Sequence, residues 1–250
     1  MADRQTTVKS GWQTKELVTK YLQGVRVAFP AAELELTMIR RIVNAWQPNA
    51  RNILDLGCGD GILGRMIMEA CPTAHATFVD FSQPMLDALR AKSLDWNRAT
   101  IVVGDFSTPA WMREVSERGP FDVVVSGFAI HHQPDERKRQ LYAEIFSLLS
   151  KGGLFLNLEH VASLTPAGQE LFSDYSIDNL FEFHRASDPT KTRNEIATEF
   201  HNRPDKKENI LAPVDAQVEW LRNIGFSDVD CFFKLFEIAL FGGRRPSSAP

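Results

Sequence analysis

The chain has 250 residues, of which 44% are hydrophobic and 24% charged, with a formal net charge of −4. This composition is typical of a soluble globular protein with one α/β domain or two small domains, and its acidic balance argues against binding of nucleic acid through a basic surface. Its three cysteines, at positions 58, 71 and 231, are too few and too scattered for a disulfide framework or a C-x-x-C metal site. No apolar run is long enough to span a bilayer and no secretion signal is visible, so we expect a cytoplasmic protein.

Two amphipathic helices are predicted before the first strand. Apolar residues recur at helical intervals over residues 12–27, at Trp12, Leu17, Tyr21, Leu22 and Val25. Pro30 closes that segment. A second helix is predicted over residues 31–46.

The sequence ILDLGCGDG, residues 53–61, predicts a buried strand that turns sharply into a helix over residues 61–70. Gly57 and Gly59 have no Cβ, so they can take positive φ values and let a ligand lie against the main chain. The helix that follows points unpaired N–H groups at the turn, which favours a carboxylate or other polar group there. The spacing is G-x-G-x-G. It differs from the dinucleotide motif, because position 62 is Ile62, and no Gly-Lys-Ser/Thr of a phosphate loop follows.

Two further predicted strands also end in acids. Residues 75–81 end at Asp80, about 20 residues beyond the glycines, where a carboxylate can accept hydrogen bonds from both hydroxyls of a ribose. The alternative for Asp80 is a helix N-cap, but Ser82 is better placed for that role. Residues 99–106 end at Asp105. Together with Asp55, these acids mark successive strand ends, where ligands sit in open parallel sheets.

The glycine segment is similar to the glycine motif of class I S-adenosylmethionine-dependent methyltransferases, and the resemblance covers about residues 33–243. It implies an α/β, three-layer Rossmann-like fold. Its seven-stranded sheet should be mostly parallel with an antiparallel C-terminal strand, and a helical N-terminal lid and a helical cap insertion should be added to it. It also implies S-adenosyl-L-methionine as the cofactor.

The resemblance assigns roles to individual residues. Asp80 would bind the ribose, Phe81 and Met85 would border the adenine, and Asp105 would receive the adenine amino group beside Phe106. On the lid, Tyr21 and Arg26 are candidates for the methionine carboxylate; the alternatives are packing for Tyr21 and a solvated charge for Arg26. The expected cofactor contacts are Tyr21, Arg26, Asp55, Gly57, Cys58, Gly59, Asp80, Phe81, Met85, Gly104, Asp105, Phe106 and Ser126.

The fourth and fifth predicted strands carry the candidate bases. Residues 121–132 end in SGFAIHH and residues 149–160 in NLEH, which supplies His132, Glu159 and His160. A histidine with a pKa near neutrality can deprotonate a hydroxyl or an amine. The alternative is that His131 and His132 cap the helix that begins near Asp135, because methyl transfer to an already nucleophilic atom depends mainly on in-line placement.

About 55 residues separate the fifth strand from the last predicted helix, which is longer than the usual links in such folds. Their apolar residues at helical spacing predict a helical cap over residues 162–212 that shapes the acceptor pocket, although such aromatics are more often core. The spacings of the histidines at 160, 184 and 201 match no metal-ligand pair, so no metal is expected. The expected acceptor-pocket residues are Phe128, Tyr175, Phe181, His184, Phe200, His201 and Arg203.

The chain is therefore divided into a lid helix (1–32), a cofactor-binding core (33–161), the cap (162–212), a helix and strand hairpin that complete the core (213–243) and a disordered tail (244–250). The expected activity is methyl transfer to a small, apolar or aromatic acceptor, with the assembly left open between monomer and homodimer. One alternative is an enzyme similar to carboxy-S-adenosylmethionine synthases, in which Arg203 would hold the extra carboxylate. The other is a non-catalytic protein of the same fold.

Overall fold

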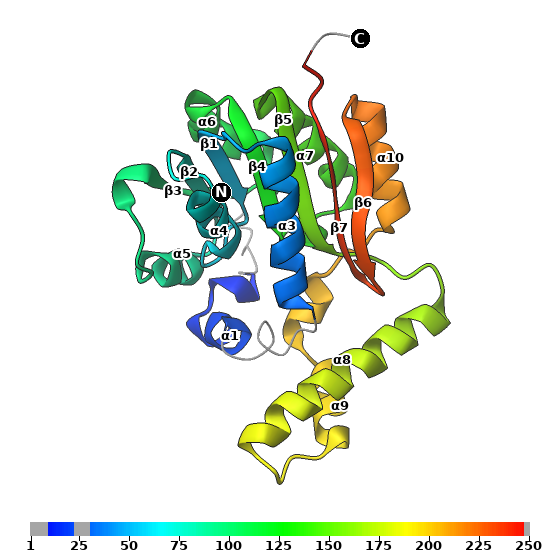
Figure 1. The fold of residues 1–250 in the computed structure, drawn as a ribbon. Helices are drawn as coiled ribbons and strands as arrows, with labels where there is room; N and C mark the ends of the chain where they lie inside the picture. Colours follow the sequence, from blue (N-terminus) through cyan, green and yellow to red (C-terminus); the bar gives the residue numbers. More distant parts are fainter. Residues whose placement is uncertain (1–9, 23–30, 248–250) are drawn as a thin grey trace, which may run out of the picture.

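The computed structural model describes residues 10–22 and 31–247. Its strands form one seven-stranded sheet in the order β3-β2-β1-β4-β5-β7-β6 (Figure 1). Only β7 runs antiparallel to its neighbours β5 and β6, so the predicted sheet is confirmed. The strands are β1 Asn52–Leu56, β2 His75–Asp80, β3 Ala99–Val103, β4 Phe121–Gly127, β5 Leu149–His160, β6 Ser227–Leu235 and β7 Ile238–Arg244.

Helices cover both faces of the sheet and give three layers. One face carries α3 (Ala32–Trp46), α4 (Ile62–Ala70) and α5 (Gln83–Arg90), and the other carries α6 (Met112–Val115), α7 (Asp135–Leu148) and α10 (Val214–Ile224). Short 3-10 helices lie at Gly11–Gln13, Trp96–Arg98, Pro109–Trp111, Ser116–Arg118, Ile130–His132 and Pro204–Glu208. Among the helices of the described part of the chain, none combines the length and the apolar character needed to cross a membrane.

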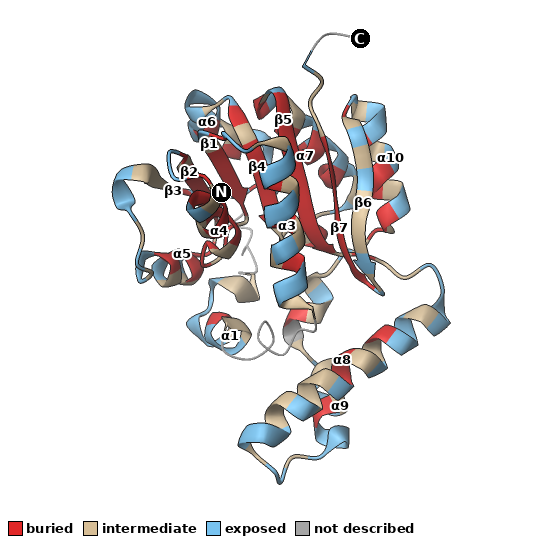
Figure 2. Cartoon of the chain, in the orientation of Figure 1, coloured by how far each residue is buried: buried red, intermediate tan, exposed pale blue. Residues whose placement is uncertain are grey.

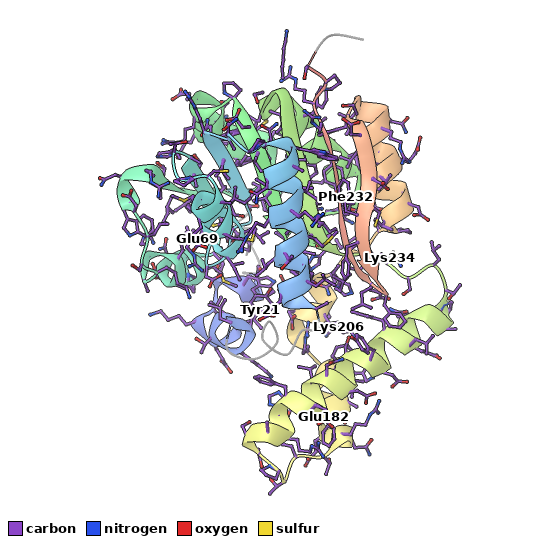
Figure 3. The ribbon with its side chains drawn as sticks, viewed as in Figure 1. Tyr21, Glu69, Glu182, Lys206, Phe232 and Lys234 are labelled. Carbon is purple, nitrogen blue, oxygen red and sulfur yellow. The ribbon has the colours of Figure 1, made fainter. Side chains whose placement is uncertain are left out.

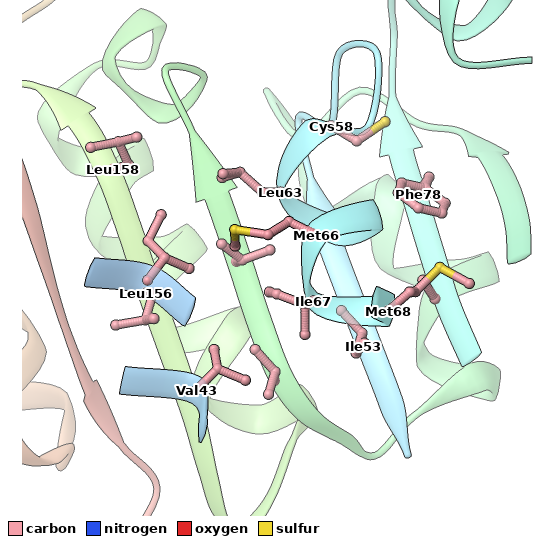
Figure 4. Packing of buried hydrophobic residues seen from close by; sticks show 14 of the residues in the cluster. Val43, Ile53, Cys58, Leu63, Met66, Ile67, Met68, Phe78, Leu156 and Leu158 are labelled. Atoms are coloured by element: carbon pink, nitrogen blue, oxygen red, sulfur yellow. The ribbon is translucent and has the colours of Figure 1, made fainter. Parts of the chain in front are cut away.

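The core is split between the two faces because successive strand residues point to opposite sides. In β5, Leu154, Leu156 and Leu158 pack with α3 and α4, whereas Phe155 packs with α7 and α10. Figure 4 shows Leu156 and Leu158 facing Leu63, Met66 and Ile67 of α4. The central strands are buried over most of their length (Figure 2), which explains their almost continuously apolar sequences.

The predicted helical insertion consists of α8 (Pro166–Ser187) and α9 (Arg193–His201), which extend away from the sheet (Figure 1). Thr165 caps α8 by accepting a hydrogen bond from the Gly168 N–H. Arg193 at the start of α9 forms ion pairs with Asp174 and Asp178 of α8. The two helices therefore stabilise each other as a unit.

Both ends of the chain differ from the sequence predictions. The single helix expected over residues 12–27 is broken: the 3-10 helix Gly11–Gln13 is followed by α1 (Lys15–Lys20), because the Thr14 hydroxyl starts a new helix by accepting from the Leu17 N–H. Residues 23–30 lie outside the described residues. At the other end, residues 244–247, which were expected to belong to a disordered tail, are part of the described structure. Arg244 ends β7, and the N–H of Arg245 donates to the Gly153 carbonyl at 2.8 Å.

Candidate functional site

Two adjoining cavities lie at the carboxyl ends of the parallel strands. The larger has a volume of about 470 Å³ and is lined by the glycine turn, the ends of β2 and β3 and the segment around Trp12. The smaller has a volume of about 160 Å³ and extends towards α8, α9 and the loop after them. Figure 3 shows Tyr21 and Lys206 at this end of the molecule, with Glu182 farther out on α8. The residues common to both walls, hereafter the shared wall, are Trp12, Tyr21, Ala32, Glu35, Phe128 and His132.

The glycine turn presents bare backbone to the larger cavity. Gly57 has φ +66°, and a Cβ at this position would lie 2.3 Å from the Cβ of Ala129. Gly59 has φ +55°, and a Cβ there would meet only the Met85 sulfur, at 3.6 Å. The N–H groups of Gly57 and Cys58 donate to the Val79 carbonyl at 2.8 and 3.0 Å. The turn is thus fixed to β2 while its cavity side stays free of side-chain bulk.

Asp80 faces the same cavity from the end of β2. Its Oδ2 accepts a hydrogen bond from the Gly59 N–H and its Oδ1 accepts one from the Ser82 N–H, both at 2.8 Å. Burial raises the pKa of Asp80, and the hydrogen bonds from Ser82 and Gly59 oppose that rise. Each carboxylate oxygen has a second lone pair, so Asp80 can still accept two hydrogen bonds from a ligand. The predicted N-cap is confirmed, because Ser82 caps α5 by accepting from the Met85 N–H.

Asp55 lies deeper, in the floor of the larger cavity. Its Oδ2 accepts a hydrogen bond from the Gly64 N–H at 2.8 Å, which ties β1 to the first turn of α4. Burial raises the pKa of Asp55 to about 8, and the charges of Asp80 and Asp60 add to the rise. A cationic ligand in the cavity would therefore favour the ionised form of this carboxyl.

The remaining predicted cofactor contacts fall into two groups. One group lines the larger cavity and consists of Tyr21, Cys58, Phe81, Met85, Asp105 and Phe106. The other group is absent from the wall formed by the described residues. Ser126 is fully buried and donates to the Leu56 carbonyl at 2.8 Å, and the Gly104 N–H donates to the Asp80 carbonyl at 3.1 Å, so both stabilise the sheet. Arg26 lies outside the described residues.

Two of the three candidate bases are engaged in buried or half-buried pairs. The carboxylate of Glu159 is fully buried and accepts hydrogen bonds from the backbone N–H groups of His131 and His160, both at 3.0 Å. The Nδ1 of His131 lies 2.5 Å from the Oε1 of Glu159. His160 lines the smaller cavity, and its Nε2 lies 2.9 Å from Glu237. Glu159 lines neither cavity among the described residues, which places it beneath the site.

His132 is the candidate base in the shared wall. Its Nδ1 lies 3.2 Å from the Glu208 carbonyl, so Nδ1 carries the proton and Nε2 keeps its lone pair. Burial, followed by the neighbouring His131, lowers the pKa of His132 to about 4. The imidazole is therefore neutral near pH 7. The alternative role, a cap for the following helix, is wrong: the N-cap of α7 is Pro134, without a side-chain hydrogen bond.

The predicted acceptor-pocket residues are divided by the position of α8 and α9. Phe200 and Arg203 line the smaller cavity, and Phe128 lies in the shared wall. Arg203 donates to Asp205 at 2.8 Å. The other four residues are absent from both walls as the described residues form them, because α8 and α9 extend away from the sheet. Tyr175 packs on Phe236, and Phe181 lies under Arg185. His184 contacts Phe183, and His201 is exposed.

The sequence prediction missed Glu35, Trp12 and Glu208. Glu35 is 3% exposed and lies four residues before the buried Ile39 on α3. An acid on the apolar stripe of a helix was a readable signal. Glu208 gave no such signal, because its contact with the Ser10 hydroxyl joins residues 198 positions apart.

Within the described ranges, no group of three or more His, Cys, Asp or Glu side chains is arranged to hold a metal ion.

Comparisons with known proteins agree with this architecture. Residues 53–153 match the family model described as a methyltransferase domain. An uncharacterised methyltransferase of Anoxybacillus flavithermus is 31% identical over 140 residues, which is 53% of this chain and 61% of that protein. A demethylmenaquinone methyltransferase of Leptospira interrogans is 30% identical over 125 residues, 49% of this chain and 47% of that protein.

A solved structure shares the fold: an O-methyltransferase family protein from Burkholderia thailandensis has 17% identity and a TM-score of 0.62, covering 94% of this chain and 60% of that one. The chain thus spans only about half to three fifths of the length of these proteins. The strand order, the glycine turn and the family match confirm the resemblance seen in the sequence. Residues 53–153 are therefore similar to a methyltransferase domain, within a fold that the chain shares with an O-methyltransferase family protein.

Proposed function

We propose that this chain transfers the methyl group of S-adenosylmethionine to a small, apolar or aromatic acceptor. The observation that carries the proposal is the larger cavity, where the bare backbone of Gly57 and Gly59 lies beside the carboxylate of Asp80. The cofactor supplies a methyl group on a cationic sulfur. The chain supplies a binding site on one side and room for an acceptor on the other.

The cavity fits the cofactor in size and chemistry. Its volume of about 470 Å³ falls within the range of roughly 300–1,000 Å³ common for ligand sites. Asp80 can accept hydrogen bonds from the ribose hydroxyls, and Phe81, Met85 and Phe106 give the adenine ring an apolar surface. The buried Asp55 lies near the glycine turn, and the cationic part of a cofactor bound there would favour its ionised form.

The smaller cavity is our proposed acceptor site. It adjoins the larger one through the shared wall, and the aromatic rings of Phe128, Phe172 and Phe200 line it. Holding the acceptor against the cofactor in this way supplies proximity and orientation, which can contribute several powers of ten to the rate. Trp12 lines both cavities, and the segment around it would act as the lid.

Calorimetry with S-adenosylhomocysteine tests the cofactor site. Asp80→Ala should weaken binding about tenfold or more, because hydrogen bonds to a charged group are worth about 1.5–3 kcal/mol. Asp87→Ala is the matched control, since Asp87 is exposed on the following helix; it should bind within twofold of the native chain. Thermal melts of both variants establish that they are folded. Native protein that fails to bind the compound would contradict the proposal.

Methyl transfer itself is tested with methyl-labelled S-adenosylmethionine and a panel of small aromatic acceptors, scored by labelled product. The same reactions separate the alternatives. Mass spectrometry of a copurified ligand would reveal a carboxylated cofactor if the chain acted on the cofactor itself, although the Arg203 guanidinium is already bound by Asp205. Cofactor binding without transfer to any acceptor would favour a non-catalytic protein.

A further inference from the structure

Glu35 is a buried acid that the fold does not explain. It lies in the first turn of α3 with 3% of its surface exposed, and it belongs to the shared wall. Its Oε1 has no hydrogen-bond partner among the described residues. Buried polar atoms in native proteins are nearly always paired, and leaving one unpaired costs about 1–3 kcal/mol. This atom is therefore a candidate for contact with a ligand.

A purely structural role for Glu35 is inconsistent with its surroundings. Acids in the first turn of a helix stabilise it through the helix dipole, but the exposed Glu33 on the same turn already provides that charge. Burial raises the pKa of Glu35 to about 7, which means that its ionised form is disfavoured in the free protein. A leucine at this position would continue the stripe of Ile39 and Val43. The carboxyl thus lowers the stability of the fold.

A second unpartnered polar atom lies in the same wall. The Nε1 of Trp12 is buried and has no hydrogen-bond acceptor among the described residues. Its backbone is held in place, because the Trp12 carbonyl accepts a hydrogen bond from the Ser82 hydroxyl at 2.5 Å. The shared wall therefore offers a buried unpartnered acceptor on Glu35 and a buried unpartnered donor on Trp12, beside the neutral imidazole of His132 and the rings of Tyr21 and Phe128.

We infer that the acceptor carries a hydroxyl group, which donates to Oε1 of Glu35 while an oxygen of the same molecule accepts from Nε1 of Trp12. A hydroxyl both donates and accepts, whereas an ammonium group only donates, so the pair selects a neutral hydroxylated compound over an amine. The aromatic lining of the smaller cavity selects an apolar or aromatic body. This inference rests on the proposed function, since the hydroxyl would lie where the two cavities meet.

Probe ligands test the inference without knowledge of the natural acceptor. Binding of 2-naphthol, 2-methoxynaphthalene and 2-naphthylmethylamine is measured by calorimetry in the presence of S-adenosylhomocysteine. The native protein should bind 2-naphthol about tenfold more tightly than the methyl ether, which cannot donate, and more tightly than the amine. Equal binding of the naphthol and the ether, or tighter binding of the amine, would overturn the inference.

Variants then assign the preference to the two atoms. Glu35→Leu should reduce the preference for the naphthol over the ether to within twofold, whereas Glu35→Gln should retain part of it because the amide oxygen still accepts. Trp12→Phe should weaken both oxygen-containing probes by a similar factor. Glu33→Leu, on the same helical turn but exposed, is the matched control and should behave as the native chain.

The affinity for S-adenosylhomocysteine separates this inference from the proposed function. A thermal melt establishes that Glu35→Leu is folded, and its affinity for S-adenosylhomocysteine should fall by a smaller factor than its affinity for 2-naphthol. Loss of cofactor binding in this variant with an unchanged naphthol preference would assign Glu35 to the cofactor and overturn the inference alone. Native protein that binds the naphthol selectively but not S-adenosylhomocysteine would overturn the proposed function instead.

Discussion

His131 and Glu159 form a buried pair, with Nδ1 2.5 Å from Oε1 and the His131 N–H 3.0 Å from Oε2. Burial lowers the pKa of His131 and raises the pKa of Glu159 to about 7, so burial disfavours the charged form of each partner. The pair fixes the loop between β4 and α7 to the end of β5. The adjacent His132 is thereby held in the shared wall.

This arrangement predicts that Glu159 contributes to stability more than to chemistry. Glu159→Ala leaves the ring of His131 and the N–H of His160 without partners and should lower the free energy of unfolding by about 3 kcal/mol. At about 2–4 °C per kcal/mol for a chain of this size, the melting temperature should fall by roughly 6–12 °C. His132→Gln is the comparison and should melt within about 3 °C of the native protein while changing the rate of methyl transfer. A Glu159→Ala protein that melts like the native one would contradict this assignment.

The glycine turn gives a second prediction, because its two glycines differ in their surroundings. Alanine at position 57 has an unfavourable φ and a Cβ 2.3 Å from Ala129, so Gly57→Ala should be destabilised by about 2–4 kcal/mol. Gly59→Ala has an equally unfavourable φ, but its Cβ would have open space apart from Met85. We expect this variant to be destabilised by about 1–2 kcal/mol. Chemical denaturation measures both.

The same two variants also separate stability from binding. The Cβ at position 59 would occupy the larger cavity, so Gly59→Ala should weaken S-adenosylhomocysteine binding about tenfold even though it is the more stable variant. Full cofactor affinity in Gly59→Ala would show that no ligand approaches this backbone.

Most of the sheet and much of the lining of the larger cavity could be predicted from the sequence. The strands are apolar because both faces are covered, and the acids at positions 55, 80 and 105 mark strand ends directly. The lining of the smaller cavity could not be predicted equally well. Residues such as Tyr175 and His184 have the right chemistry, but α8 and α9 carry them away from the sheet, and helical periodicity does not encode the direction in which a helical pair extends.

For a related reason, the sequence could not distinguish which of the three candidate bases faces the cavity. His132, Glu159 and His160 all follow strand ends, so spacing alone gives them equal access to the cavity. The structure distinguishes them by pairing, which joins residues distant in sequence such as His160 and Glu237. Glu35, in contrast, stands on the stripe of Ile39 and Val43, and that conflict between a charge and a buried helical face was visible in the sequence.

The buried carboxyls predict an unusual dependence of stability on pH. The pKa of Asp55 is raised from 3.8 to about 8, so the folded state binds more protons than the unfolded state between these values. Stability should therefore fall as the pH rises through this window. Asp55→Asn removes the ionisation, and its carbonyl can still accept from the Gly64 N–H.

The gain in unfolding free energy from Asp55→Asn should be smaller near pH 5 and should grow by roughly 4 kcal/mol towards pH 8, at about 1.4 kcal/mol per pH unit. Urea denaturation of both proteins between pH 5 and pH 8 measures this difference in unfolding free energy. Asp122→Asn provides the comparison, since Asp122 is half-buried and accepts hydrogen bonds at the opposite end of the strands. A gain that is independent of pH would show that Asp55 is ionised in the folded protein.

The segment over the larger cavity gives the last prediction. Glu208 accepts hydrogen bonds from the Gly11 N–H at 2.9 Å and from the Ser10 hydroxyl at 2.7 Å, while its carbonyl contacts His132. Glu208→Ala removes the side-chain bonds but leaves the carbonyl in place. Without these two hydrogen bonds, the free energy that holds residues 10–13 in place should fall by about 1–2 kcal/mol. Hydrogen exchange of these residues should therefore be faster, and S-adenosylhomocysteine should bind roughly threefold to tenfold more weakly.

The exchange of the sheet should not change in Glu208→Ala, because none of its strands depends on this contact. Glu219→Ala is the control: Glu219 is exposed on α10, on the opposite face of the sheet from α3, and its removal should leave both exchange and affinity unaltered. Faster exchange at residues 10–13 without weaker cofactor binding would show that this segment covers the cavity without contributing to the affinity. Unchanged exchange would show that the contact with Ser82 is sufficient to hold the segment, and Ser82→Ala in the Glu208→Ala background would then release it.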